Sequence, residues 1–336
     1  MKKSLIACSA ALACLGAAHA QSNVQLTGLV DMYAGSMKLA GANRTSQVGS
    51  GGMTTSWWGM TGTEDLGGGL KAGFALTAFF RGDTGAPGRF DSDNFFARDA
   101  NVSLSGGFGT VKLGRAMAPN FLPTILFNPF GDSFTVSPLV LHGVSFFNAA
   151  DTGWSNQITY TTPSFGGLKA NVHYQFGEQA GATGKNNVGV NLIYFSGPVG
   201  LTAVYEKADV ANPAGTTLYA NGPHQHWMLG GSYNFGPAKL YATYGQSEFT
   251  DVTNSEKKTY SLGLDVPVTK NGTLKAAVAQ TKVDATNTKR TTATLGYDHF
   301  LSKRTDLYTA LMYDKNTALA ANETGTSLVA GIRHRF

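Results

Sequence analysis

Tyr260-Ser261-Leu262-Gly263-Leu264-Asp265-Val266 alternates apolar residues with small or polar ones. A period of two places one chemistry on each face of an extended strand, whereas an amphipathic helix repeats every 3.6 residues. The same rhythm recurs at residues 188–194, 239–244 and 292–298. The chain is therefore predicted to consist largely of strands that are apolar on one face and polar on the other.

Working outward from this stretch, the pattern predicts sixteen strands, most of them near the roughly 9–11 residues that a tilted strand needs to cross a bilayer. The predicted ranges are 24–37, 53–65, 69–81, 98–105, 109–115, 156–163, 168–179, 186–194, 199–208, 226–234, 238–248, 256–266, 272–281, 288–299, 305–315 and 326–336. Short turns that contain Gly and Pro alternate with longer polar segments, as in a transmembrane barrel.

Sheet structure in lipid has to close on itself, because every backbone polar group must find a partner within the protein. The sequence therefore predicts an all-β fold, a 16-stranded antiparallel transmembrane β-barrel. Several tyrosines share the parity of the aliphatic residues and fit an interfacial girdle: Tyr194, Tyr205, Tyr244, Tyr260 and Tyr297. The alternative is a soluble β-sandwich, into which sixteen regular strands fit poorly.

The N-terminus has the features of a secretory signal. Lys2 and Lys3 precede an apolar run, and Ala18-His19-Ala20 is a small-x-small cleavage site. We expect residues 1–20 to be a signal peptide and residues 21–336 to be the barrel domain. Both cysteines, Cys8 and Cys14, would be removed with it, which excludes cysteine catalysis and thiolate metal sites from the mature chain.

The charge and the motifs argue against an enzyme or a nucleic-acid partner. Removing Lys2 and Lys3 leaves 24 basic and 21 acidic residues, a balance too even to indicate nucleic-acid binding. The histidines lack metal-ligand spacing, and no nucleophile elbow or convincing triad occurs. We therefore expect no catalytic activity, no cofactor and no metal site, although an outer-membrane enzyme or adhesin remains a weaker alternative.

Several stretches make the chain resemble the trimeric general porins of the outer membrane, of the betaproteobacterial and neisserial type. They are residues 62–72, 111–115, 160–170, 232–238, 301–305 and the end, Gly331-Ile332-Arg333-His334-Arg335-Phe336. The resemblance implies a homotrimer in outer-membrane lipid. It also implies a water-filled channel for passive diffusion of small hydrophilic solutes and ions, and a terminal Phe336 that the barrel-assembly machinery recognises. The alternative within this class is a substrate-preferring channel with an aromatic-lined constriction.

The resemblance also implies that segment 116–155 folds back into the barrel as a constriction loop, with arginines on the wall facing carboxylates on the loop. Arg81 shares the parity of the lumen-facing residues, whereas Arg98 matches a wall arginine of the family although simple alternation would turn it outward. Asp132 is the first candidate for the loop carboxylate and Asp151 the second. Confined charges of this kind set which ions enter a channel.

Trp57 departs from the family, which commonly has arginine at this position. Parity places Trp57 and Thr61 on the lumen face, so we expect a thinner, partly aromatic basic wall and weaker anion selectivity. Trp57 packing under the loop is an equally good alternative. Arg115 shares the parity of Val111 and Leu113, so we expect it at a subunit interface, paired with Asp91 or Asp93 of the next protomer.

Overall fold

The computed structural model describes residues 23–145, 151–178, 185–210, 224–249, 255–321 and 323–336. The expected signal peptide, residues 1–20, lies outside these ranges. The strands are β1 Asn23–Met37, β2 Thr45–Ser50, β3 Trp57–Gly67, β4 Leu70–Arg81, β5 Ala86–Pro87, β6 Asp99–Gly106, β7 Gly109–Met117, β8 Gly153–Thr161, β9 Leu168–Gln175, β10 Asn187–Ser196, β11 Val199–Ala208, β12 His224–Asn234, β13 Lys239–Phe249, β14 Glu256–Pro267, β15 Gly272–Val283, β16 Thr288–Phe300, β17 Thr305–Asn316 and β18 Thr324–Arg335.

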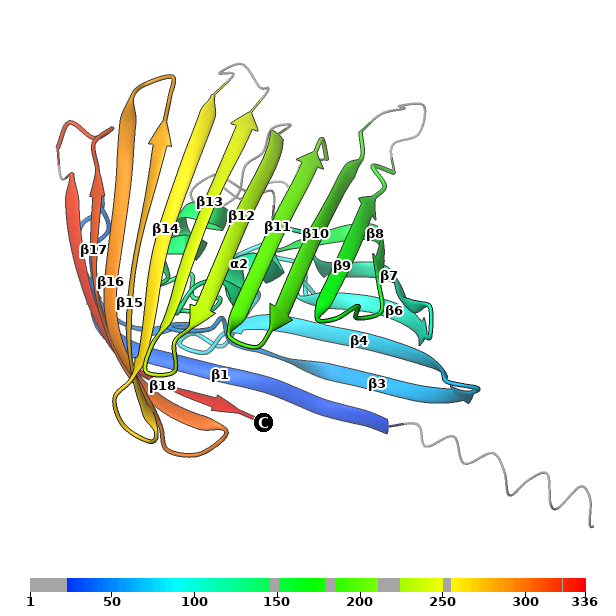
Figure 1. The fold of residues 1–336 in the computed structure, drawn as a ribbon. Coiled ribbons are helices and arrows are strands. Elements are labelled where there is room, and N and C mark those ends of the chain that lie inside the picture. The colour runs from blue at the N-terminus through cyan, green and yellow to red at the C-terminus, as the bar shows by residue number, and fades with distance from the viewer. Residues whose placement is uncertain (1–22, 146–150, 179–184, 211–223, 250–254, 322) are drawn as a thin grey trace, which may run out of the picture.

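Sixteen of these strands form a closed barrel. β2 and β5 are short hairpin strands within the long loops, and every remaining neighbour pair is antiparallel. The first strand, β1, pairs with the last, β18, from Leu29↔Arg335 to Ser36↔Leu328, which leaves the barrel wall without a free edge. The prediction of a 16-stranded antiparallel barrel is confirmed. The C-terminus and the turns that join β14 to β15 and β16 to β17 lie at the bottom of Figure 1, and the turns that join β3 to β4 and β6 to β7 lie at the right.

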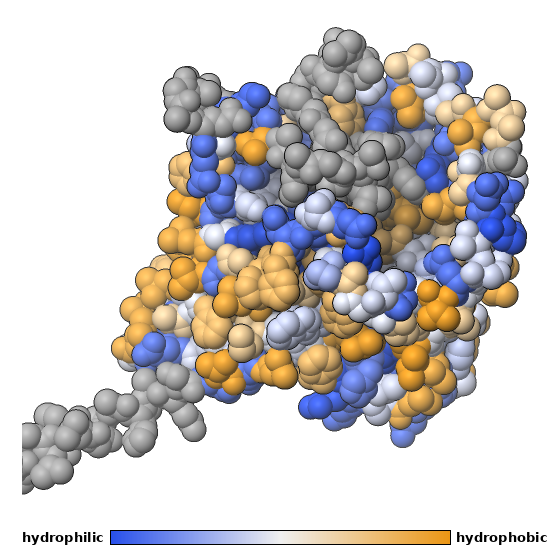
Figure 2. Space-filling model, turned by 180° about the vertical axis from the view of Figure 1, so that it is seen from behind, coloured by the Kyte–Doolittle hydropathy of each residue, from blue (hydrophilic) through white to orange (hydrophobic). Residues whose placement is uncertain are grey.

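The two faces of the barrel differ in chemistry as the alternation predicts. Side chains such as Thr243, Ser247 and Ser261 point inward and are buried, whereas Leu240 and Leu262 point outward and are exposed. Figure 2 shows hydrophobic residues over the flanks of the barrel and hydrophilic ones at its lower rim and upper opening. No helix among the described residues is long and apolar enough to cross a membrane.

The first long connection differs from its prediction. The strand expected at 53–65 begins at Trp57, because the Asp31 carboxylate accepts hydrogen bonds from the amides of Gly52, Met53 and Thr54 at 3.1, 2.8 and 2.8 Å. These bonds satisfy backbone donors that a strand would have paired with a neighbour, so the segment turns into the lumen. Residues expected in a loop form β2, which extends the barrel wall beside β1.

The connection between β7 and β8 folds into the barrel, as the resemblance implied. It contains α2 Phe121–Leu126, α3 Pro138–Val140 and the single π-turn η1 Leu141–Ser145. Its apolar side chains pack on the inner wall, where Phe130 and Val136 join a buried cluster with Tyr33, Tyr308 and Val329. Burying these side chains offsets the cost of placing a long segment inside a polar channel.

Glycines on the lumen face make room for this loop. A methyl group added at Gly189 of β10 would lie 2.3 Å from Pro119, and one added at Gly263 of β14 would lie 2.5 Å from Pro129. At Gly296 of β16 it would lie 2.9 Å from the Phe130 ring. These three strands thus lack a side chain where the loop comes closest.

Candidate pore constriction

Barrel side chains fix the infolded loop at several separate points. Lys275 donates to the Pro129 carbonyl at 3.0 Å, and Asn191 donates to the Pro119 carbonyl at 2.8 Å. Thr294 donates to the carbonyl of Val136 at 2.7 Å. Because these bonds satisfy backbone groups that would otherwise be buried without partners, the loop is a fixed part of the channel wall.

The loop also meets the other inward segment. The Ser133 hydroxyl donates to the Gly52 carbonyl at 2.6 Å, and the Thr135 hydroxyl donates to that of Gly51 at 2.8 Å. Asn128 holds the turn that connects α2 to Ser133, because its side-chain oxygen accepts from the Phe130 amide at 2.8 Å. The loop tip is therefore held in place from both sides.

His142 anchors the far end of the loop. Its two ring nitrogens lie 2.8 Å from the Thr281 hydroxyl and 2.9 Å from the Thr292 hydroxyl, on β15 and β16. Complete burial, together with the nearby charge of Arg290, lowers the pKa of His142 to about 3, although Asp314 acts in the opposite direction. The ring is therefore neutral and donates one hydrogen bond while it accepts the other.

Asp132 lies at the loop tip and is half-buried. Burial raises the pKa of this carboxyl, whereas a hydrogen bond from Thr54 and the positive charges of Arg333 and Arg98 act in the opposite direction. Arg333 also donates to the Thr54 hydroxyl at 2.8 Å. The loop carboxylate and two wall arginines thus belong to one electrostatic group.

Arg98 and Trp57 are in direct contact. The Arg98 guanidinium carbon lies 3.9 Å from the centre of the Trp57 ring, within the range of a cation–π interaction. Arg98 also forms an ion pair with Asp99 at 2.8 Å and reaches the lumen-facing Thr77 at 3.4 Å. Its side chain points inward despite its parity, because Arg98 precedes the first residue of β6.

Arg81 and Thr61 lie apart from this group. Arg81 is at the end of β4 and pairs with Asp91 at 2.7 Å, with the Asp91 side chain 95% exposed. An exposed pair of this kind contributes little to stability. Thr61 faces the lumen on β3, opposite Ala75 and farther from the loops than Trp57. Among the hydrogen bonds and ion pairs of the described residues, none joins Thr61 to the charged group.

Asp151 was expected as a loop carboxylate and Arg115 at a subunit interface, but the two residues form a buried ion pair with each other. Asp151 contacts Arg89 at 2.8 Å and Arg115 at 2.7 Å. Burial alone would raise the pKa of Asp151, but the two guanidinium groups hold it below its usual value. A carboxylate between two arginines adds little to a field across the channel.

The expected pairing of Arg115 with a neighbouring protomer is therefore corrected. Arg115 is buried and pairs within its own chain, while Asp91 and Asp93 pair with Arg81 and Arg89. The register of β7 and β8 shifts between Gly114 and Ala116. A bulge of this kind breaks the alternation on which the expectation rested.

Sequence reasoning missed Arg333. It lies on the lumen face of β18 and pairs with Asp306 at 3.0 Å and with Asp298 at 3.5 Å. Parity alone could have found it, because Ile332 and His334 on either side turn outward. The basic groups of this wall, Arg98, Arg333 and Lys275, each have a carboxylate partner, so the wall is close to neutral.

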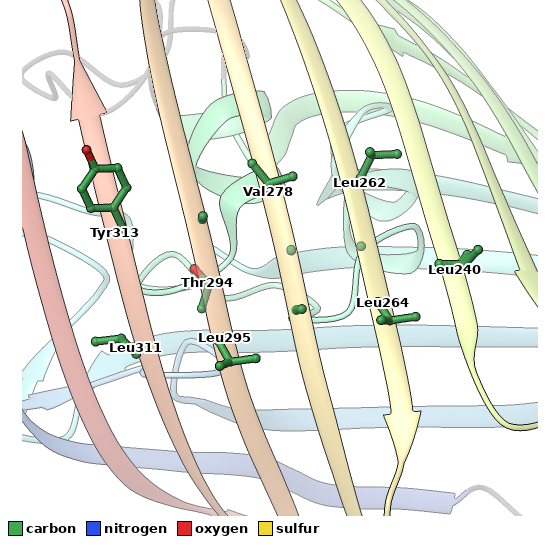
Figure 3. Close-up of a pocket in the computed structure, with 12 residues that line it drawn as sticks. Leu240, Leu262, Leu264, Val278, Thr294, Leu295, Leu311 and Tyr313 are labelled. Atoms are coloured by element: carbon green, nitrogen blue, oxygen red, sulfur yellow. The ribbon is translucent and has the colours of Figure 1, made fainter.

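One apolar hollow lies on the outer surface of the barrel. A groove of about 510 Å³ crosses β13 to β17, and Figure 3 shows its apolar side chains on the strands in front of the infolded loop. Its labelled aliphatic residues are Leu240, Leu262, Leu264, Val278, Leu295 and Leu311. An apolar surface of this kind suits lipid chains and not hydrophilic solutes.

Comparisons with known proteins agree on one family. A family profile described as Gram-negative porin matches residues 7–319. "Outer membrane porin protein 32" of Delftia acidovorans is 37% identical over 365 residues, and an outer membrane porin protein of Bordetella pertussis is 28% identical over 395 residues, each match covering 100% of both chains. The solved structure "Anion-selective porin from Comamonas acidovorans" has a TM-score of 0.80 and 32% identity, and the match covers 94% of this chain and 100% of that one.

Proposed function

Because this chain belongs to the Gram-negative porin family, we propose that Arg98, Arg333 and Asp132 form a pore constriction with a weak preference for anions. The protein is an outer-membrane channel through which small hydrophilic solutes and ions diffuse passively. The proposal concerns which residues set its selectivity, and in which direction.

The stacking of Arg98 on Trp57 carries this proposal. An arginine that lies on an aromatic ring, with Asp99 at 2.8 Å, keeps its charge but has a counter-charge beside it. Arg333 is balanced in the same way by Asp306. The paired charges therefore largely cancel, and little net potential remains toward the channel. The anion selectivity stated for the Comamonas porin supports the sign, and these ion pairs support its weakness.

The reversal potential in a KCl gradient across a planar lipid bilayer tests the proposal. Trp57→Arg adds a lumen charge and should raise the chloride-to-potassium permeability ratio. A unit charge about 8 Å from the ion path, at an effective permittivity of about 40–80, changes the energy of an ion by about 0.5–1 kcal/mol. This energy changes the local concentration of each ion roughly two- to fivefold, in opposite directions for chloride and potassium. Trp57→Phe keeps an aromatic ring and serves as the matched control. An unchanged ratio in Trp57→Arg would contradict the proposal while leaving the channel itself established.

The choice between a general pore and a substrate-preferring one needs a separate measurement. We propose general diffusion, so that liposomes containing the protein swell at rates that fall with sugar size and do not saturate. Saturation by one solute would instead support the substrate-preferring alternative.

We also propose that the protein is a homotrimer. Outward apolar side chains on β1 and β6 support this proposal, because Val24, Leu26 and Val102 are 61%, 64% and 54% exposed in the single chain. In a trimer these side chains would pack against a neighbouring subunit in place of lipid, which adds van der Waals contacts. Light scattering of the detergent-solubilised protein should give three chains per particle. In the same preparation, mass spectrometry should find Gln21 as the first residue if residues 1–20 are a signal peptide.

A further inference from the structure

A patch with both aromatic and cationic groups lies on the lumen wall between the infolded loop and the short-turn rim. We call it the vestibule patch, and it consists of Phe195, Ser232, Lys239 and Tyr241. Register places all four on the inner face: Phe195 lies opposite Gly200, while Ser232 lies opposite both Gly200 and Tyr241. Lys239 shares the parity of Tyr241 on β13. None of the four belongs to the constriction described above.

Lys239 has aromatic neighbours in place of a carboxylate. Its ammonium group lies 4.8 Å from the centre of the Tyr241 ring and 6.0 Å from that of Phe195. The carboxylate across the strand pair, Asp265, accepts from Tyr241 at 2.8 Å and pairs with Lys275 at 3.2 Å. Within the described parts of the chain, no carboxylate lies within ion-pair distance of Lys239. Its positive charge therefore remains available to a solute.

Phe195 presents an apolar surface beside this charge. Its ring lies 5.6 Å from that of Phe127 in the loop, nearly parallel to it at 12°. The loop ring is buried, whereas Phe195 remains 42% exposed inside the channel. Gly200 lets the ring lie close to the wall, because a methyl group there would come within 2.6 Å of it. Phe195 is thus held by its neighbours and still open to solutes.

Ser232 adds a polar group next to the ring. A methyl group at Gly200 would lie 2.5 Å from the Ser232 hydroxyl and 2.6 Å from Phe195, so both side chains lie over the same glycine. The hydroxyl is buried and has no hydrogen-bond partner among the described residues. A buried polar atom without a partner is uncommon and indicates a place where a polar guest completes the bonding.

We propose that the vestibule patch binds aromatic carboxylates, with the carboxylate on Lys239 and the ring against Phe195. A lone ammonium group would attract any small anion, but the exposed ring beside it selects anions that carry a flat apolar body. Aromatic pairs are favourable beyond the surface that they bury. This inference rests on the proposed passage of anions through the constriction, and it adds a second site below that constriction.

Benzoate is the probe. Acetate has the carboxylate without the ring, and benzyl alcohol has the ring without the carboxylate. Single-channel chloride current is measured in planar bilayers while each compound is added. Benzoate should reduce the current in a saturable way, at concentrations well below those needed for acetate or benzyl alcohol. Lys239→Gln should raise the half-blocking benzoate concentration by about tenfold or more, because it removes a charge-assisted contact. Phe195→Leu should raise it by about two- to tenfold.

Lys303→Gln is the matched control, since Lys303 is exposed in a short turn at the same rim. Its half-blocking benzoate concentration should equal that of the parent protein. Equal block by acetate and benzoate, or unchanged block in both Lys239→Gln and Phe195→Leu, would overturn the inference. Current and reversal potential in KCl alone report on the constriction, so a failure of the vestibule patch can be told apart from a failure of the proposed selectivity.

Discussion

At the scale of the residue, His142 shows how one neutral ring can hold a loop in a channel. Its ring bonds to Thr281 and Thr292, and complete burial keeps the imidazole uncharged. Its pKa in the folded protein is about 3, compared with 6.5 for the free side chain. A released loop would therefore take up a proton below about pH 6.5, while the attached loop would not. The attachment is strongest above pH 6.5 and weakens as the pH falls toward 3.

This titration predicts more frequent loop fluctuations in acid. Single-channel recordings between pH 7 and pH 4 should show rising current noise. His142→Gln keeps one hydrogen bond, loses about 1 kcal/mol of attachment at pH 7, and should lose most of the pH dependence. If the noise of His142→Gln rises with acid as steeply as that of the parent, His142 is not the group responsible.

Single residues also mark the limits of what the sequence allows. Trp57 could be placed on the lumen face because alternation within a regular strand is a local property. Arg115 could not be placed, because a bulge shifts the register beside it. The inward turn of Arg98, just before β6 begins, depends on contacts with Trp57 and Thr77 that sequence spacing does not encode.

At the scale of the element, the infolded loop and its wall fit each other closely. The glycines at positions 189, 263 and 296 leave space that the loop fills. Sequence alternation predicted the strands that carry them but not this role, because a glycine on a polar face has no pattern of its own. β3 begins later than the sequence predicted, because the amides of residues 52–54 donate to the Asp31 carboxylate. Local alternation does not reveal these bonds between separate segments of the chain.

The fit predicts that Gly263→Val narrows the channel. The added side chain would overlap Pro129, which a methyl group already approaches to 2.5 Å. Overpacking of this kind costs about 1–3 kcal/mol and pushes the loop toward the open path. Single-channel conductance in KCl should fall. Gly231→Val is the control, because Gly231 turns outward beside Leu201. An equal fall in both variants would show that the barrel, and not the loop, responds.

At the scale of the whole molecule, Phe336 completes the barrel. Its backbone exchanges hydrogen bonds with Gly28 at 3.0 and 3.1 Å, while its ring is 42% exposed. We propose that this ring is what the barrel-assembly machinery recognises. Deleting Phe336 should then reduce the amount of protein in the outer membrane of cells severalfold while leaving refolding into detergent micelles nearly unchanged. Heat-modifiable migration on gels measures both. Equal losses in cells and in micelles would assign Phe336 a structural role only.

The pairing of β1 with β18 has a consequence for how the chain is made. β1 is synthesised before the other strands and pairs with β18, which is synthesised last. The barrel therefore cannot close while only part of the chain has been made. Long-range pairing of this kind is slow to form and exposes apolar surface until it is complete. The polypeptide must therefore reach its membrane in an unfolded state. Because of this topology, it requires chaperones that prevent its aggregation on the way.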